Sequence, residues 1–384
     1  MPAVCANSTA SYAPERHRYS GLRYRPPEPD TSTATDGPVV ARFLEAARAR
    51  GIVTQLQVQA AIPPGYRVQF GGGDPEDEPL LPDGSRLERR VDKNGSLASP
   101  HIRAYLVALL QDLAAAYPMV DAVRLDWPEY PPYTLESCFV DFSAHARAAA
   151  VRLGYDVELM RRDCAAALSG LLAGAVDTES ACTGDGGRYA LGRALQRLPG
   201  IVVSSRFKAD LVVELLTMAR AALPEAVGLV PQTFPPPWSL ASGFDCSRAA
   251  AVADGIGVKL YTMHWPMMAR FYAEALGSTD AAARLVVDLL DIGAPASSGF
   301  ADLDYPGPGV AHPVGADAQR RKLEAVVREA GPCPVFAFAH SYGPADDALE
   351  RFRIAWDAPV AGVWINRYGY LSDEKLRAIG RAVG

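Results

Sequence analysis

An arginine and two acidic residues lie close together within residues 124–129 of this chain. Arg124 and Asp126 are two residues apart, so on a β-strand their side chains project to the same face. A guanidinium favours the ionised form of a nearby carboxylate, and an ionised Asp126 could attack an anomeric carbon or stabilise positive charge there. A structural Arg–Asp pair at a strand end is the alternative. The aromatic residues Trp127 and Tyr130, which follow directly, favour a functional site.

Glu129 is the nearest second acid to Asp126. Hydrolysis of a glycosidic bond uses two carboxyl groups on either side of the bond, roughly 5 to 9 Å apart depending on the mechanism. Glu129 follows Asp126 by three positions, past Pro128, and a turn of the chain could bring it to that distance. It could equally be a loop glutamate in solvent. We therefore name Asp126 as the candidate nucleophile or charge stabiliser and Glu129 as the candidate acid/base.

Polar and aromatic side chains also follow other apolar runs of the chain. A histidine at a strand end can donate to a sugar hydroxyl or act as a general acid or base near neutral pH, although a lone histidine is more often structural. Flat rings surrounded by amide and guanidinium groups suit a carbohydrate, but large aromatics can also simply cap a core. Besides Arg124, Trp127 and Tyr130, the candidate substrate-binding residues are Gln57, Gln59, Tyr261, His264, Trp265, His340, Tyr342, Asn366 and Arg367.

Short apolar segments that alternate with helical patterns would position these candidates. Small and β-branched residues predict six strands, and apolar residues at helical spacing predict the helices between them. On the first strand, glutamines alternate with apolar residues. They would face the inside of a closed barrel, or solvent if the strand is half exposed. The predicted strands are 52–62, 120–127, 227–233, 257–264, 335–340 and 362–366.

The alternation of strands and helices predicts an α/β fold with a parallel sheet. Nearly every predicted strand carries polar or aromatic residues at its carboxyl end, which favours a (β/α)8 TIM barrel over a dinucleotide-binding sheet. Six strands are two fewer than eight, so we expect a barrel that lacks its first one or two strands, with 52–62 as the third. The alternative is an open six-stranded sheet. The incomplete barrel would expose two edge strands, through which oligomers could form.

The chain divides into a short N-terminal segment and one large domain. Residues 1–38 are rich in Pro, Ser, Thr, Arg and Tyr without periodicity, and we expect them to be poorly structured. Residues 39–384 are expected to form a single barrel domain that opens with a helix at 39–50. Within this domain we expect a long polar loop at 63–97 and a helical insertion at 135–200.

Composition narrows the functions that the chain could have. The 384 residues carry a formal net charge of −6 and no basic run, which argues against nucleic-acid binding. No segment approaches the roughly 18–20 apolar residues of a membrane span. The six cysteines include no CxxC pair, so we expect reduced thiols, no metal and no cofactor. We expect a cytoplasmic protein, unless a signal peptide lies upstream of Met1.

The segment Val120–Trp127, with its Arg-Leu-Asp, resembles the fourth-strand segment of α-amylase-type and related glycosidases. In that family the strand-end aspartate is the nucleophile and an arginine two residues before it contacts it, which matches Asp126 and Arg124. The wider chain is similar to uncharacterised bacterial proteins classed as glycosyl hydrolases of the TIM-barrel superfamily. The segments that carry this similarity are 99–105, 259–265 and 364–370.

The chain departs from the glycosidase pattern at two strand ends. An α-amylase-type enzyme has a glutamate at the end of its fifth strand, where this chain has Val-Pro-Gln-Thr-Phe at 230–234. Many retaining barrels have a glutamate at the end of strand seven, where this chain has His340. The resemblance therefore implies a glycoside hydrolase with a carbohydrate substrate but assigns no acid/base. The alternatives are a non-catalytic or degenerate carbohydrate-binding barrel, and a metal-dependent hydrolase or lyase that uses the histidines.

Overall fold

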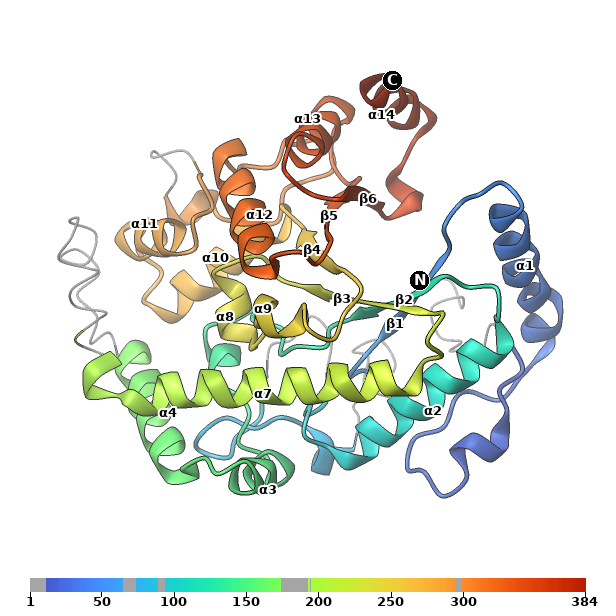
Figure 1. The fold of residues 1–384 in the computed structure, drawn as a ribbon. Coiled ribbons are helices and arrows are strands. Elements are labelled where there is room, and N and C mark those ends of the chain that lie inside the picture. The colour runs from blue at the N-terminus through green and yellow to red at the C-terminus, as the bar shows by residue number, and fades with distance from the viewer. Residues whose placement is uncertain (1–11, 65–73, 89–93, 174–192, 194, 295–298) are drawn as a thin grey trace.

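One parallel sheet forms the centre of the molecule. The computed structural model describes residues 12–64, 74–88, 94–173, 193, 195–294 and 299–384. Its six strands are neighbours in chain order and curl into a half-barrel with helices on the outer side (Figure 1). The predicted α/β barrel class is thereby confirmed, in a six-stranded form. The strands are β1 (Gln55–Gln59), β2 (Ala122–Asp126), β3 (Gly228–Thr233), β4 (Ile256–Leu260), β5 (Val335–His340) and β6 (Gly362–Asn366).

Side-chain contacts across the concave face show how far the sheet curls. The Arg124 guanidinium on β2 lies 5.0 Å from the ring centroids of both Phe338 on β5 and Trp364 on β6, so it reaches past β3 and β4 to the far side of the sheet. Gly257 on β4 permits this closure, because a Cβ there would lie 2.7 Å from the Trp364 ring. Among the strands that the structure describes, β1 and β6 each pair on one side only. The half-barrel is thus open between these two edges.

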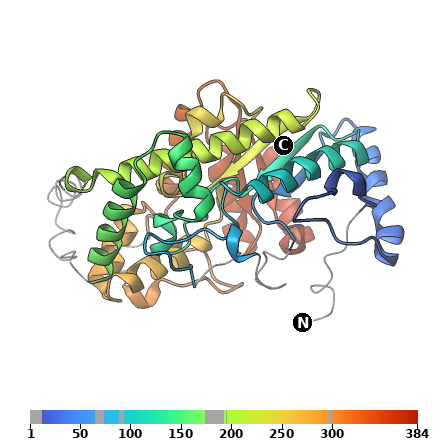
Figure 2. The ribbon, with the colours of Figure 1, turned by 90° about the horizontal axis from the view of Figure 1, so that it is seen from below.

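Helices cover the convex face of the sheet. The longest, α7, lies beside α2, and the two run along one side of the half-barrel (Figure 2). No described helix is both long and apolar enough to cross a membrane. The α-helices are α1 (Thr31–Arg48), α2 (Pro100–Ala116), α3 (Ala144–Arg152), α4 (Val157–Leu172), α7 (Pro199–Ala222), α8 (Trp238–Ser242), α9 (Cys246–Ala249), α10 (His264–Ala275), α11 (Asp280–Leu289), α12 (Ala316–Ala330), α13 (Ala345–Trp356) and α14 (Asp373–Val383).

The predicted first and fourth strands are shorter in the structure than expected. The strand expected at 257–264 ends at Leu260, and α10 begins at His264. The strand expected at 52–62 spans only Gln55–Gln59. Apolar side chains continue past both strands and are buried in loops or helices, so the composition alone overstates strand length.

The N-terminal segment is more ordered than we expected from its composition. Within 12–38, a 3-10 helix, η2 (Arg16–Tyr19), is followed by the first eight residues of α1, which begins at Thr31 and not at 39. Asp30 caps this helix by accepting a hydrogen bond from the Thr33 N–H. The phenols of Tyr12 and Tyr19 both donate to Asp112 of α2, at 2.9 and 2.7 Å. These long-range tyrosine contacts have no periodic signature in the sequence.

The long loop and the helical insertion are described only in part. Of the loop expected at 63–97, residues 65–73 and 89–93 lie outside the described residues, and 75–77 form a 3-10 helix, η4 (Pro75–Asp77). The first part of the helical insertion expected at 135–200 is split into η5 (Glu136–Phe139) and α3, whose N-cap is Ser143. Residues 174–192 and 194 of the insertion are likewise outside the described part.

Candidate active site

Asp126 ends β2 and is the centre of a buried polar cluster. One carboxylate oxygen, Oδ2, accepts a hydrogen bond of 2.9 Å from the Gln57 amide on β1. The other, Oδ1, lies 3.0 Å from the Lys259 ammonium on β4. The three residues come from separate strands, so the curl of the sheet brings them together. With 6% of its surface exposed, Asp126 is held by a rigid scaffold and still reaches solvent.

Lys259 is the residue of this cluster that we did not predict. Its side chain is fully buried, and its Nζ lies 3.0 Å from Asp126 and 3.5 Å from Glu129, so it bridges the two carboxylates. The ammonium also lies 4.7 Å from the centre of the Phe234 ring. The sequence did contain a signal for this role. Lys259 is two residues from both Gly257 and Tyr261, so the three face the same side, and one lysine in an otherwise apolar strand needs a buried anion as its partner.

Glu129 turns into the protein interior, and its carboxylate is fully buried. Trp127, with φ of 53°, and Pro128 turn the chain directly after β2. Oε2 accepts hydrogen bonds from the hydroxyls of Ser242 at 2.6 Å and Thr233 at 3.0 Å, and Oε1 accepts one from the Phe234 N–H at 2.9 Å. Burial raises the pKa of Glu129, although Lys259 and these donors act in the opposite direction. The solvated-loop alternative for Glu129 is therefore wrong.

The ammonium of Lys259 occupies the space between the two carboxylates. Lys259 Nζ lies 3.0 Å from Asp126 Oδ1 and 3.5 Å from Glu129 Oε1, so these two oxygens cannot be farther apart than the sum of those distances. In an inverting glycosidase the two acids are roughly 6.5–9.5 Å apart, which leaves room for a water between them. The separation of Asp126 and Glu129 does not exceed the lower limit of that range. The pair thus flanks a lysine in this structure, and both oxygens of Glu129 are bonded to protein donors.

Arg124 lies near Asp126 but does not form its ion pair. Its Nη2 donates to the Gln57 amide oxygen at 3.1 Å, and its guanidinium is packed between Phe338 and Trp364. The direct contact that we expected between Arg124 and Asp126 is therefore wrong. Lys259 supplies the charge adjacent to Asp126, and Arg124 orients Gln57. Gln59, the next inward-facing residue of β1, is in register with Asp126. The inward orientation of these glutamines agrees with a barrel interior.

A set of aromatic and imidazole rings lies beyond the carboxyl ends of β2, β4, β5 and β6, and we call it the ring rim. Its rings contact one another in sequence, with centroids 5.3 to 6.1 Å apart. Several members are partly exposed, including Tyr305 at 38% and Tyr370 at 51%. This rim presents flat faces to solvent at the same end of the sheet as Asp126. Its members are Trp127, Tyr133, Tyr261, His264, Tyr305, His340, Tyr342 and Tyr370.

The histidines near this rim are neutral at physiological pH. Burial, with added repulsion from Arg367 and Lys259, lowers the pKa of His264 to about 4. Burial likewise lowers the pKa of His340 to about 3, and its Nδ1 accepts a hydrogen bond of 3.0 Å from the Tyr342 N–H. A neutral imidazole can bind a sugar hydroxyl, but it is not protonated near pH 7. These histidines are thus suited to binding more than to acid catalysis.

We expect the buried histidines to make the protein less stable in acid. A histidine in the unfolded chain titrates near 6.5, above the folded-state pKa of His340, so the unfolded state binds more protons between roughly pH 6.5 and 4. The free energy of unfolding therefore falls as the pH is lowered through that range. His340→Asn keeps an acceptor for the Tyr342 N–H but removes one group that takes up a proton on unfolding. The free energy of unfolding of this variant should therefore fall less steeply with decreasing pH, by the contribution of one proton. Urea unfolding at several pH values measures this slope. The surface variant His17→Asn serves as control, and a slope unchanged by His340→Asn would contradict the assignment.

Two predicted binding residues are buried away from the rim. Tyr130 is 1% exposed, and its hydroxyl donates to Asp141 and accepts from the Leu97 N–H, so it joins two loops. Trp265 is 2% exposed and packs against Trp238 beside the Lys322 ammonium, because α10 begins one residue earlier and turns this ring into the core. The structure places neither ring where it could meet a ligand beside Asp126.

The other predicted residues lie at or beside the rim. Tyr342 is 9% exposed, and its hydroxyl donates to the Pro306 carbonyl at 2.9 Å. Asn366 is in register with His340, and its carbonyl accepts from Ser341. Arg367, with φ of 67°, is exposed, and its charge contributes to the low pKa of both His264 and His340. Asn366 and Arg367 therefore lie on the β6 side of the open half-barrel.

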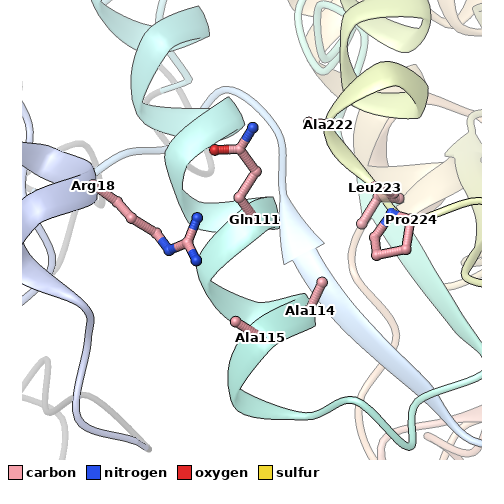
Figure 3. Close-up of a pocket in the computed structure, with 7 residues that line it drawn as sticks. All are labelled: Arg18, Gln111, Ala114, Ala115, Ala222, Leu223 and Pro224. Carbon is pink, nitrogen blue, oxygen red and sulfur yellow. The ribbon is translucent and has the colours of Figure 1, made fainter.

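A hollow of about 450 Å³ lies at the opposite end of the strands from Asp126. It lies between the last turns of α2 and α7, and the Arg18 side chain reaches toward α2, which carries Gln111, Ala114 and Ala115 (Figure 3). Its other lining residues are aliphatic or proline, and it contains no carboxylate. The residues that could carry out chemistry are thus at the carboxyl ends of the strands, and this hollow is not part of that site.

Comparison with known proteins supports the fold. No family model matches the chain, and neither does any curated protein. Among solved structures, the crystal structure of a β-galactosidase from the psychrophilic Marinomonas ef1 matches with a TM-score of 0.54 and 12% sequence identity. The match covers 95% of this chain and 53% of that chain, so this protein spans about half the length of the β-galactosidase. At this identity the similarity shows the fold alone, an α/β barrel of parallel strands.

Proposed function

We propose that this protein is a glycoside hydrolase whose carbohydrate substrate lies over Asp126. The observation that carries the proposal is the Asp126 carboxylate, bonded to Gln57 and Lys259 at the carboxyl end of a barrel strand. In α/β barrels this is the end where catalytic groups lie. A fixed carboxylate at that position is suited to attack an anomeric carbon or to stabilise the positive charge that develops on the sugar.

The ring rim supports carbohydrate as the ligand class. Sugar C–H faces pack on aromatic rings, while sugar hydroxyls need donors and acceptors beside those rings. The rim supplies both kinds of group: Tyr305 and Tyr370 have exposed faces, and His264 and His340 are neutral imidazoles. Burial also keeps the pKa of Tyr261 well above its usual value, so its phenol remains a hydrogen-bond donor.

Glu129 then has a positioning role. Its two oxygens are bonded to Ser242, Thr233 and the Phe234 N–H, and its remaining contact is with Lys259. A carboxylate enclosed in this way holds the ammonium in place, and the ammonium in turn fixes Asp126. Glu129 was our candidate acid/base from the sequence, and the two roles predict different kinetics.

A comparison of leaving groups separates these two roles for Glu129. Wild type is first screened on a panel of aryl glycosides to find a substrate. We then expect Glu129→Gln to slow hydrolysis by a similar factor, at least about tenfold, for a good leaving group such as dinitrophenol and for a poor one such as phenol, since the loss acts through Lys259. If Glu129 is the acid, only the poor leaving group is strongly affected. That selective loss would contradict the positioning role but keep the hydrolase proposal.

A non-catalytic carbohydrate-binding barrel is the second candidate function. It is favoured by one observation: among the described strand ends, Asp126 is the only carboxylate, since the others are Gln59, Thr233, Leu260, His340 and Asn366. A binding protein would retain its glycan affinity in Asp126→Asn and would cleave no glycoside in either form. Isothermal titration with the same glycosides, together with product release, distinguishes it from the enzyme.

A further inference from the structure

Two histidines and a glutamate converge outside the polar cluster around Asp126. Glu76 lies in η4, His101 in the first turn of α2 and His145 in the first turn of α3. One potential ligand atom from each of the three lies within 4.8 Å of the others. These residues are 25 and more positions apart in the sequence, so no metal-binding spacing indicated them. It is the fold that brings them together.

His145 faces carboxylates from the loop that contains η4. Its Nε2 lies 3.2 Å from Asp77 Oδ1 and 3.8 Å from Glu76 Oε1. The same nitrogen is buried and makes no hydrogen bond of good geometry. The His101 and His145 rings meet edge to face, with centroids 5.7 Å apart. Imidazole nitrogens and carboxylate oxygens are both zinc ligands, so this nitrogen and the nearby carboxylates have the chemistry to hold one ion together.

Neighbouring residues fix these carboxylates from behind. Asp77 is fully buried and accepts hydrogen bonds from the hydroxyls of Ser99 at 2.5 Å and Tyr24 at 2.6 Å. Arg23 lies 2.8 Å from Glu76 Oε2 and 3.3 Å from Asp77 Oδ2, which leaves the other oxygen of each carboxylate on the His145 side. Such outer contacts orient ligands in metal sites.

We propose that His101, His145 and Glu76, with Asp77 beside them, bind one divalent transition-metal ion, with zinc as the best match. Imidazole nitrogens with carboxylate oxygens suit zinc, whereas calcium and magnesium prefer oxygen alone. The ion would fasten the η4 loop to the starts of α2 and α3. Our sequence-based expectation of no metal rested on cysteine spacing and on the histidines at the strand ends, and did not consider this cluster.

The site has a structural connection to the segment that follows Asp126. The Ser96 N–H donates to the Asp77 carbonyl, and the Leu97 N–H donates to the Tyr130 hydroxyl. Tyr130 also bonds to Asp141, which accepts from the Leu80 N–H. A metal at the η4 loop would therefore stiffen the loops behind residues 127–130. The proposal does not depend on the glycosidase assignment.

Zinc binding by the full chain tests this site. Protein treated with a chelator and then dialysed against zinc should retain one equivalent, and its melting temperature should rise with zinc concentration. His101→Gln and His145→Gln should each weaken zinc binding at least tenfold. The matched control is His17→Gln, an exposed histidine beside Glu15 that should bind zinc as wild type does. Bound Co²⁺, read by its visible absorption, reports nitrogen ligands directly.

The outcomes of this experiment are distinct. The proposal is overturned if wild type retains no zinc above the background of the doubly substituted His101→Gln, His145→Gln protein in repeated loading, or if both single histidine variants bind zinc like wild type. Circular dichroism of the metal-free variants shows whether each one folds. If His145→Gln does not fold, the His101→Gln and Glu76→Gln variants decide the question. Hydrolytic activity is not used as a readout, so failure here leaves the proposed function untouched.

Discussion

Replacing Asp126 by asparagine is expected to reduce the turnover of a glycoside substrate by roughly a thousandfold or more, the scale seen when a nucleophile or its charge is removed. Asparagine has nearly the same shape and can still contact Gln57, so the rim and its rings remain in place. We therefore expect the glycan to bind Asp126→Asn with an affinity close to that of wild type. Initial-rate kinetics and isothermal titration with one glycoside measure both quantities.

Asp121 provides a matched control for this substitution. It stands just before the same strand, at the opposite end, and its carboxylate accepts from the Thr54 N–H and hydroxyl at 2.6 and 2.9 Å. These bonds lower its pKa, so Asp121→Asn should reduce stability while leaving turnover nearly unchanged. Equal loss of activity in the two variants would point to a general structural effect, and unchanged turnover in Asp126→Asn would refute its catalytic role.

Replacing Lys259 by methionine is expected to have the largest effect on stability. The change leaves Asp126 and Glu129 buried near each other without the cation that separates them. Removing one partner of a buried ion pair destabilises a protein by about 3–5 kcal/mol, because the remaining charge is uncompensated. Here two carboxylates lose the same partner, so we expect a loss at the upper end of that range. Urea unfolding at pH 7 measures it.

Lys322→Met is the control for burying a methionine in place of a lysine. Lys322 is also buried and lies over tryptophan rings, but its ammonium donates to the carbonyls of Pro236 and Leu290 and pairs with no carboxylate in the described structure. Its loss leaves only neutral acceptors, at a cost of about 1–3 kcal/mol.

The pH dependence of Lys259→Met gives a second readout. Burial already raises the pKa of Glu129, and Lys259 acts against that rise, so without the cation the pKa of Glu129 rises further above its value in the unfolded chain and its protonation stabilises the folded variant. Lowering the pH from 7 to 5 should therefore narrow the stability gap between variant and wild type. A gap that is constant with pH would contradict the bridging role of Lys259.

The sequence predicted the fold class and the end of the sheet where the site lies. The alternation of strands and helices requires a parallel sheet, and the polar residues after each strand indicated its carboxyl end. The sequence could predict that Asp126 and Gln57 face the same side of the sheet, because the period-two alternation of a strand determines which side chains point inward. The inward orientation of these two side chains follows from the local residue pattern of each strand.

Other parts of the site depend on contacts that no local pattern encodes. Lys259 becomes the partner of Asp126 only because the curl of the sheet brings β4 toward β2. Trp265 was assigned to the site because the strand was expected to reach His264, whereas α10 begins there and turns the ring into the core. The proposed metal site requires η4 to meet the first turns of α2 and α3. Long-range geometry of this kind lies beyond residue spacing.

A crystal structure of Asp126→Asn with a bound oligosaccharide tests the central claim most directly. The inactive variant keeps the rim intact and does not consume its ligand. If Asp126 is the catalytic carboxylate, a sugar ring packs on the ring rim with its anomeric carbon roughly 3–3.5 Å from the substituted side chain at position 126, the distance of a reactive arrangement. A glycan bound in the hollow between α2 and α7, or on the rim with every anomeric carbon turned away from position 126, would contradict it.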